Sequence, residues 1–274
     1  ASEVNRTEEA VYMPNGKGVN VSFILKELGI DSVATGFKAG FTGEFIESEL
    51  HKAGIKTDFV SVNGITRINV FAHVVANNEE FKLVNQGPTV TEKEELQLLS
   101  IIDTLSSEDM LFVSGSHPSG ISKSTYEKIA KSSQQKGFKL ILDTSASFVP
   151  ELLKFHPYLI KPNDEELASW FGLKDVSLEQ IKEYGNKLLQ QGAQNVLVSR
   201  GSKGAILFTS TGEVLGANIA NGKVVSTIAA GDSMLAMFVA KYDETKDYKL
   251  SLQYASAAGG ATSFSAGVGK KELI

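Results

Sequence analysis

The chain has 274 residues, of which 42% are hydrophobic and none is cysteine, and its formal net charge is −5. This length allows one large α/β domain or two smaller ones, and the negative charge argues against nucleic acid and anionic membranes as partners. Without cysteine, neither disulfides nor thiolate chemistry is available. No apolar run is long enough to span a bilayer and no signal-peptide core opens the sequence, so we expect a cytoplasmic protein.

The first candidate site is the glycine-containing stretch Pro14–Val21, which precedes a helical pattern. It is not a phosphate-binding P-loop, because no glycine lies five residues before Gly16 and neither Ser nor Thr follows Lys17. Lys17 is then either a charge on a flexible loop or a contact where bare backbone meets a ligand. Asn20, one turn further on, could point toward the same ligand.

A short strand is predicted over Val33 to Phe37 and a helix over Glu44 to Ala53, with Gly40 between them. The spacing of the glycines does not match the dinucleotide fingerprint, so NAD is not expected. Two interpretations of Gly40 remain open. It either lets the backbone approach a small ligand or serves only the turn between strand and helix.

The next segment departs from the α/β pattern and predicts a small antiparallel sheet. Asn63-Gly64 is a strong hairpin signal, and Asn77-Asn78 is a second turn signal. Arg67 and Asn69 share one face, which indicates either a lid over an anionic, polyhydroxylated ligand or a solvated surface. The strand-like segments are Thr57–Val62, Thr66–Val75 and Phe81–Val84.

After Thr91 helices and strands alternate, which is typical of a doubly wound, mostly parallel sheet with helices on both faces. In such sheets ligands bind at the carboxyl ends of the strands, where several polar clusters of this chain fall. The helices run over Glu92–Leu105 and up to about Lys136, and the strands over Met110–Val113, Leu140–Asp143, Tyr158–Ile160, Asn195–Ser199 and Ala205–Phe208. The polar clusters are Ser114 to Gly120, Asp143, Lys161 to Glu166 and Ser199 to Gly204.

Two polar residues at a predicted helix start, Asn163 and Glu166, are three apart and share a face. They could hold waters around a Mg²⁺ ion that is bound to phosphates, or Glu166 could simply be a first-turn carboxylate. The four histidines show no ligand spacing, so a metal cage made by the protein alone is not expected. No Gly-x-Ser-x-Gly elbow follows a strand, so hydrolysis by a Ser/His/Asp triad is not expected either.

Near the C-terminal end, small residues lead into an apolar run that ends at Lys241 and predicts a helix starting at or just before Asp232. The small side chains of Ala229, Ala230 and Gly231 would let an anion approach the free N–H groups of this helix. Asp232 would then lie beside a bound phosphate, where a carboxylate can take up a proton. The alternative is an ordinary acidic residue at a helix N-terminus.

Five of these motifs occur in the order seen in the ribokinase-like (PfkB) carbohydrate kinases, and the resemblance covers nearly all of the chain. Within that family the chain most resembles bacterial 1-phosphofructokinases, through Thr66–Val70 and Glu3–Arg6, with tagatose-6-phosphate kinases next. The resemblance implies one ribokinase-like domain over 1–274, with a β lid formed mainly by 57–84 and by 2–13. The five motifs are Asn15–Asn20, Ser114–Ser116, Lys161–Glu166, Ser199–Gly204 and Ala229–Asp232.

The resemblance also implies roles for individual residues. Asp232 would be the general base, and Ala229, Ala230 and Gly231 would form the anion hole for the transferring phosphoryl group. Asn163 and Glu166 would hold Mg²⁺ through water. ATP would be bound by Lys161, Asn163, Ser199, Gly201, Gly204, Thr227 and Ala258. The sugar phosphate would be bound by Gly16, Lys17, Asn20, Gly40, Arg67, Ser116 and Asp232, with Lys17 and Arg67 facing the phosphate already on the sugar.

We therefore expect ATP-dependent phosphorylation of a ketose phosphate, with fructose 1-phosphate converted to fructose 1,6-bisphosphate. A tagatose-6-phosphate kinase is one alternative, and a non-catalytic sugar-phosphate-binding protein on a kinase fold is another. Retention of Asp232, Lys161, Asn163 and Glu166 favours the enzyme. A homodimer formed through the lid is one expected assembly.

Three features depart from the family pattern. Asn15 stands where the family usually has Gly, and Ala229 replaces a Gly that is common in phosphofructokinases. The third is the family's first strand, which ends in a substrate-binding Asp: it would lie before Glu3, ahead of this sequence.

Overall fold

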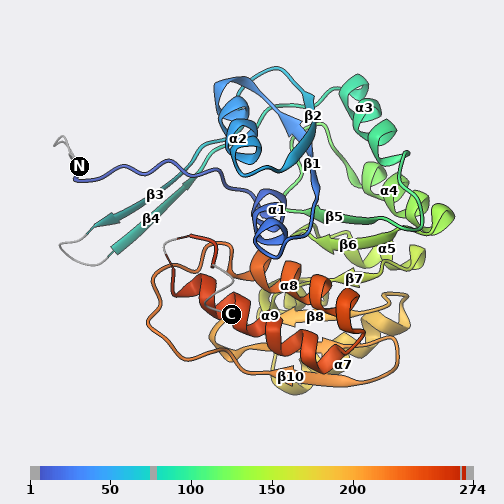
Figure 1. Cartoon of the computed structure of the whole chain (residues 1–274). Coiled ribbons are helices and arrows are strands. Elements are labelled where there is room, and N and C mark those ends of the chain that lie inside the picture. Colours follow the sequence, from blue (N-terminus) through green and yellow to red (C-terminus); the bar gives the residue numbers. More distant parts are fainter. Residues whose placement is uncertain (1–6, 75–78, 266, 270–274) are drawn as a thin grey trace.

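The computed structural model describes residues 7–74, 79–265 and 267–269, and its centre is a six-stranded sheet with strand order β10-β9-β8-β7-β6-β5 (Figure 1). Neighbours from β5 to β8 pair in parallel, and β9 and β10 are antiparallel to their neighbours. The strands are β5 Met110–Ser114, β6 Lys139–Asp143, β7 Leu159–Ile160, β8 Val196–Ser199, β9 Ala205–Phe208 and β10 Val214–Ala217. These bounds agree with the sequence-based strands to within about a residue, and β10 was not predicted.

Helices cover both faces of this sheet, as expected for a doubly wound fold. Side chains alternate across each strand, so Leu140 and Leu142 pack on one face and Ile141 packs on the other. The face of Ile141 is covered by α8 and α9, which lie side by side in Figure 1. The helices are α1 Lys17–Glu27, α2 Gly40–Lys52, α3 Glu92–Ile102, α4 Lys123–Lys136, α5 Val149–Leu152, α6 Asp164–Trp170, α7 Leu178–Gln190, α8 Ala230–Thr245 and α9 Tyr248–Ser263.

Fully buried apolar side chains hold the layers together. Leu140, Ile141 and Leu142 are each at most 2% exposed, and burial of one such side chain stabilises the fold by about 1.5–3 kcal/mol. On the far face, Leu167 and Leu188 anchor α6 and α7 against the same core. The carboxyl edge of the parallel strands, where the polar clusters lie, is therefore fixed by packing from both sides.

The first antiparallel hairpin predicted from the sequence is wrong. Strand β2 (Lys56–Ser61) pairs in parallel with β1 (Val33–Lys38), with Ala34 opposite Thr57, and the two form a separate sheet. The intervening helix α2 makes a β-α-β unit, and this tertiary pairing overrides the local turn signal of Asn63-Gly64.

The second predicted hairpin is present as a small separate antiparallel sheet. Strand β3 (Asn69–Val74) pairs with β4 (Glu79–Val84), and the hairpin projects from the body of the molecule (Figure 1). Its predicted turn at Asn77-Asn78 lies outside the described residues. Residues 7–16 contain no strand, and residues 2–6 of the predicted lid segment are also outside the described part. Arg67 comes just before β3 and not within it.

Between the two sheets lies a cavity of about 1000 Å³. Every residue of β1 and most residues of β5 line it, because β5 is the last strand of the central sheet and has no strand partner on its outer edge among the described residues. Its lining continues past the carboxyl end of β5 to Gly115 and Ser116. In the described part of the chain, no helix combines the length and the hydropathy needed to cross a membrane.

Candidate active site

The start of α8 is built from small residues, as the sequence indicates. The helix begins at Ala230, and Ala229 before it adopts a left-handed conformation with φ 63°. This conformation is uncommon for a residue with a Cβ and costs about 1–2 kcal/mol. The N–H groups of the first turn, including those of Gly231 and Asp232, have no acceptor one turn earlier in the helix, so they are free to stabilise a negatively charged group.

Asp232 is buried in this first turn and is held by one amide. The Nδ2 of Asn20, a buried residue of α1, donates a hydrogen bond to Asp232 Oδ2 over 2.7 Å. Burial raises the pKa of Asp232. The hydrogen bond from Asn20 works against this shift, the nearby Asp143 adds to it, and Lys161 and Lys17 also oppose it. A buried carboxylate with a raised pKa at a helix start is well suited to accept a proton.

A second carboxylate, Asp143, lies in the same site at the end of β6. Its Oδ1 is 2.8 Å from Lys17 Nζ and 3.2 Å from Lys161 Nζ, and the Asp143 side chain is fully buried. Its other oxygen, Oδ2, has no hydrogen-bond partner within the described residues. The sequence places Asp143 among the polar residues at strand ends and indicates no role for it. The only available signal was a charged residue directly after a buried apolar strand.

Lys17 and Lys161 both lie close to the start of α8. A Cβ added at Gly231 would come within 3.3 Å of Lys161 Nζ, so this ammonium group lies against the first turn. Burial works against the charge of Lys17, but the attraction of Asp143, a hydrogen bond to it, and the charges of Glu166 and Asp232 outweigh burial and raise the pKa of Lys17. The site thus combines two lysines with two buried carboxylates.

Asn163 and Glu166 form a capping box at the start of α6. The N–H of Glu166 donates to Asn163 Oδ1 over 2.7 Å, and the N–H of Asn163 donates to Glu166 Oε2 over 2.9 Å. This geometry accounts for the spacing of the pair by helix capping alone. Among the residues that the structure describes, no group of three or more His, Asp or Glu side chains gathers in a way that could hold a metal ion.

The loop after β8 is shaped by its glycines. A Cβ at Gly204, where φ is 79°, would lie 2.0 Å from the carbonyl oxygen of Ala217, so only glycine fits there. Gly201 also has a positive φ, and Arg200 N–H closes the loop on the Gly204 carbonyl over 2.8 Å. Ser199 ends β8 beside Asn163, with which it forms an isolated bridge. The assignment of this loop to ATP stays a prediction.

Two further residues that the resemblance assigns to ATP are Thr227, just before α8, and Ala258, within α9. The carbonyl of Thr227 accepts a hydrogen bond of 3.4 Å from the N–H of Ala230. Ala258 is fully buried in α9, in the region that packs against α8. Thr227 therefore shapes the turn into α8, and the role of Ala258 at the adenine also stays a prediction.

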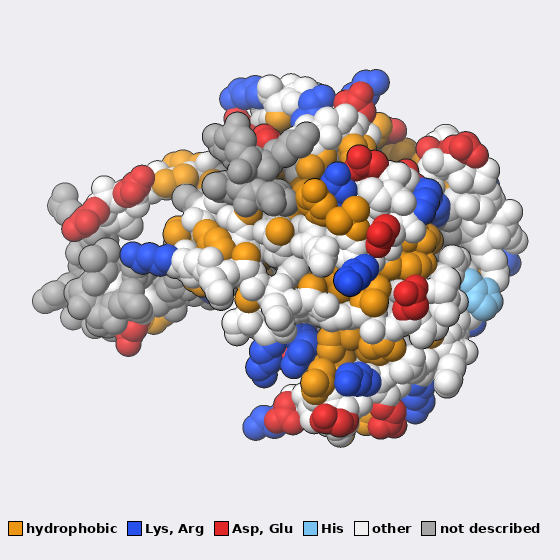
Figure 2. Space-filling model, turned by 60° about the horizontal axis from the view of Figure 1, so that its bottom comes forward, with side chains coloured by type: hydrophobic (Ala, Val, Ile, Leu, Met, Phe, Trp, Pro, Cys, Tyr) orange, Lys and Arg blue, Asp and Glu red, His pale blue; other side chains and the backbone are white. Residues whose placement is uncertain are grey.

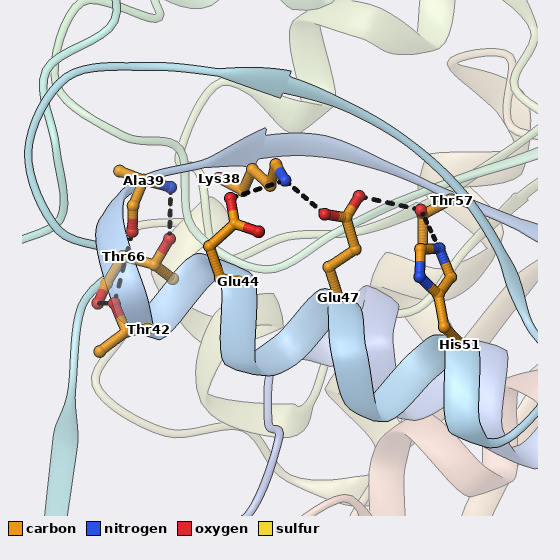
Figure 3. Close-up of polar contacts among 8 residues, drawn as sticks. All are labelled: Lys38, Ala39, Thr42, Glu44, Glu47, His51, Thr57 and Thr66. Carbon is orange, nitrogen blue, oxygen red and sulfur yellow. Dashed lines mark hydrogen bonds and ion pairs between the residues drawn. The ribbon is translucent and has the colours of Figure 1, made fainter.

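The base of the projecting hairpin is pinned to the start of α2 (Figure 3). The backbone N–H of Thr66 donates to the Ala39 carbonyl over 2.9 Å, and the Thr66 hydroxyl accepts from the Ala39 N–H over 2.8 Å. The Thr42 hydroxyl donates to the Thr66 carbonyl over 2.7 Å. Gly40 makes this contact possible, because a Cβ there would come within 2.8 Å of the carbonyl oxygen of Gly64. Close packing against Gly64 is therefore enough to explain the glycine at position 40, and its contact with substrate stays a prediction.

Figure 3 also shows how α2 is tied to the two strands beside it. Lys38, at the end of β1, pairs with Glu44 over 2.9 Å and with Glu47 of the same helix. Glu47 also accepts a hydrogen bond of 3.0 Å from the hydroxyl of Thr57 in β2. These contacts fix α2 against β1 and β2. Thr66, the residue before Arg67, is hydrogen-bonded to Ala39 between β1 and α2.

The structure brings most of the predicted substrate residues to the same cavity. Gly16, Lys17, Arg67 and Ser116 all line the 1000 Å³ cavity. Asn20 lines a neighbouring pocket of about 60 Å³ together with Asn15 and Ala229.

Comparison with known proteins assigns the chain to a family. The model of the family described as "pfkB family carbohydrate kinase" matches residues 1–272. The chain belongs to this family of carbohydrate kinases. The fold and the family predicted from the sequence are therefore confirmed.

Individual members of the pfkB family agree with this assignment. The chain is 47% identical to a D-tagatose-1-phosphate kinase from Bacillus licheniformis, over 97% of this chain and 86% of that protein. It is 36% identical to a 1-phosphofructokinase from Bacillus subtilis, over 99% and 88%. A crystal structure of a phosphofructokinase-2 mutant from Escherichia coli superposes with a TM-score of 0.92, at 26% identity, over 100% and 90% of the two chains. As a pfkB member with such relatives, the chain is an ATP-dependent sugar-phosphate kinase, which sets aside the non-catalytic alternative.

Proposed function

We propose that the protein transfers the γ-phosphoryl group of ATP to the 6-hydroxyl of a ketohexose 1-phosphate. The observation that carries this proposal is the buried carboxylate of Asp232 in the first turn of α8, beside a cavity lined by the cations Lys17 and Arg67. A general base near a free primary hydroxyl and cations for phosphate groups are the two requirements of this reaction.

In this mechanism Asp232 takes the proton of the 6-hydroxyl as its oxygen attacks the γ-phosphorus, and the bond from that phosphorus to ADP breaks. The N–H groups at the start of α8 stabilise the charge on the transferring group, because they are fixed in place before the reaction. Lys161, which lies against Gly231, adds a positive charge at the same point.

Mg²⁺ fits this site only through water. The oxygen atoms of Asn163 and Glu166 suit a hard cation, yet both side chains already cap α6, so they have capacity for waters of the ion and not for a full set of direct bonds. When bound with ATP, Mg²⁺ would neutralise phosphate charge.

Three candidate substrates differ in the configuration of the ketose or in the position of its phosphate. The 47% identity to a D-tagatose-1-phosphate kinase, against 36% to a 1-phosphofructokinase, favours D-tagatose 1-phosphate ahead of fructose 1-phosphate, which the sequence motifs favoured. These two sugars differ only in the configuration at carbon 4. Tagatose 6-phosphate presents the same groups with the ends exchanged, and a relative from Staphylococcus epidermidis that is 32% identical is named as its kinase.

The test is a comparison of kcat/KM for the three ketose phosphates and for ribose. We expect both 1-phosphates to exceed tagatose 6-phosphate at least about tenfold, and ribose to be poorer still because it brings no phosphate to the cations that line the cavity. Protein with Asp232→Asn, purified in parallel, controls for contaminating kinases. A tenfold preference for tagatose 6-phosphate would overturn the choice of substrate and leave the kinase activity intact.

We further propose that the β3–β4 hairpin joins two copies of the chain. Its hydrophobic side chains are exposed on an arm that projects from the body (Figure 2). A two-stranded hairpin is marginally stable in water, so these side chains need a cover. A structure of Escherichia coli phosphofructokinase-2 is described as a tetrameric inhibited form, which supports assembly in this family. The exposed residues are Ile68, Val70, Phe71, Val74, Phe81, Leu83 and Val84.

The hairpin dimer can be tested with Phe81→Glu, a change at a side chain that is 52% exposed. Light scattering after gel filtration should show a dimer for the unmodified protein and a monomer for the variant. Loss of a buried Phe and burial of a charge should weaken association by at least about 100-fold. Leu96→Glu, at an equally exposed position on α3, is the matched control and should remain dimeric. A monomeric unmodified protein, or a dimeric Phe81→Glu variant, would rule out this interface.

A further inference from the structure

The cluster of Lys17, Asp143 and Lys161 draws on three different elements. Lys17 is the first residue of α1, Asp143 is the last of β6, and Lys161 follows β7. Asp143 is fully buried and Lys161 is 5% exposed, while the side chain of Lys17 is 35% exposed at the edge of the cavity. The mechanism above uses both lysines but gives Asp143 no step.

Both ammonium groups lie on the same carboxylate oxygen. Lys17 Nζ and Lys161 Nζ are 2.8 and 3.2 Å from Asp143 Oδ1, so the two cations are held close to each other although like charges repel. The negative charge between them offsets one of the two positive charges. Removal of that carboxylate would leave two cations together in a buried place, which is strongly unfavourable.

Lys161 and the helix that carries Lys17 both contact the first turn of α8, where we propose that phosphoryl transfer takes place. Lys161 Nζ lies against Gly231, and Asn20, one turn after Lys17 on α1, holds Asp232. The same helix therefore carries the ligand of Asp143 and the ligand of the general base. The position of Lys17 beside Lys161 is unexpected for a residue whose partner is a phosphate at the far end of the sugar.

We propose that Asp143 is a positioning residue that holds Lys17 and Lys161 together beside the first turn of α8, where Lys17 acts on the phosphoryl group in transfer. This inference rests on the proposed phosphoryl-transfer mechanism and changes the role of Lys17 within it. The phosphate already on the sugar is then left mainly to Arg67, which lines the same cavity from the base of the hairpin.

The proposal predicts which kinetic constant changes. Asp143→Asn keeps the size of the side chain and one acceptor oxygen but removes the charge that gathers the lysines. Turnover, kcat, should fall by about 100-fold, as expected for a small displacement of groups at a reacting centre. The KM for the sugar phosphate should stay within about threefold, since an interaction made mainly in the transition state affects kcat and not substrate binding.

A double-mutant cycle with Lys17→Met tests whether Asp143 acts through Lys17. Lys17→Met alone should lower kcat with little change in the KM of the sugar phosphate, and its effect should shrink by at least about tenfold in the Asp143→Asn background. Glu95→Gln is the matched control, because Glu95 is a largely buried carboxylate that holds Lys128 and Thr125 between α3 and α4, away from the site. It should lower the melting temperature without changing kcat.

The outcomes separate this inference from the proposed function. Turnover by the unmodified protein together with an unchanged kcat in Asp143→Asn, or additive effects in the cycle, would overturn the inference alone. No turnover of any ketose phosphate by the unmodified protein would instead count against the proposed substrate class. If Asp143→Asn does not fold, Lys17→Met decides, because a raised KM for the sugar phosphate at constant kcat contradicts the proposed position of Lys17.

Discussion

Asp232→Asn is expected to lower kcat by about 10²–10⁴-fold, the usual contribution of a positioned general base. The asparagine can still accept the hydrogen bond from Asn20, so the shape of the site and the affinity for ATP should be retained. The measurement is steady-state release of ADP with a saturating ketose phosphate. Turnover close to that of the unmodified protein would mean that another group takes the proton.

The raised pKa of Asp232 adds a second readout to this variant. Because burial disfavours the ionised carboxyl in the folded protein, the ionised form destabilises the fold once the pH exceeds the ordinary pKa, and the full penalty is present above the raised folded pKa. Asn at this position removes the penalty, so the melting temperature at neutral pH should stay equal or rise. In the unmodified enzyme, kcat/KM should begin to fall on the acid side at a higher pH than an ordinary carboxyl would give.

Arg67→Ala is expected to raise the KM for the sugar phosphate far more than the KM for ATP. The loss of a charge-assisted pair with a phosphate should cost about 2–3 kcal/mol if the closed lid excludes water. Arg67 is exposed in the structure, but its backbone leaves directly from Thr66, which three hydrogen bonds tie to the start of α2. The Arg67 side chain is therefore attached to a fixed backbone position at the rim of the cavity.

The control for Arg67 is Lys93→Ala, which removes an exposed cation of α3 that does not line the cavity. It should change neither KM. Equal changes of both KM values in Arg67→Ala would show that Arg67 is a solvated surface residue without a specific partner.

Periodicity and composition were sufficient for the central sheet because its strands are buried on both faces. Leu140–Leu142 and Val196–Val198 form short apolar runs followed at once by polar residues, which locates both the strand and its functional end. The small residues before Asp232 likewise predicted the helix start, and the structure begins α8 two residues earlier, at Ala230.

The remaining features depend on partners that are distant in the sequence. Asn63-Gly64 carries a hairpin signal, but β2 finds a better partner in β1, more than twenty residues earlier. Asp143 acquires its two ion-pair partners only because the fold brings α1 and the segment after β7 next to the end of β6. Neither pairing leaves a trace in local spacing, so sequence reasoning could not have found them.

The left-handed Ala229 has a consequence for the rigidity of the site. A glycine there would remove the local conformational cost, yet it would also give the unfolded chain more freedom, and these two effects on stability are similar in size and opposite in sign. What the methyl group changes is the range of backbone conformations near the observed one, because at positive φ alanine can occupy only the small left-handed region, whereas glycine can enter much more of that space. The N–H groups proposed to face the phosphate therefore follow a turn with less conformational freedom than a glycine would give it.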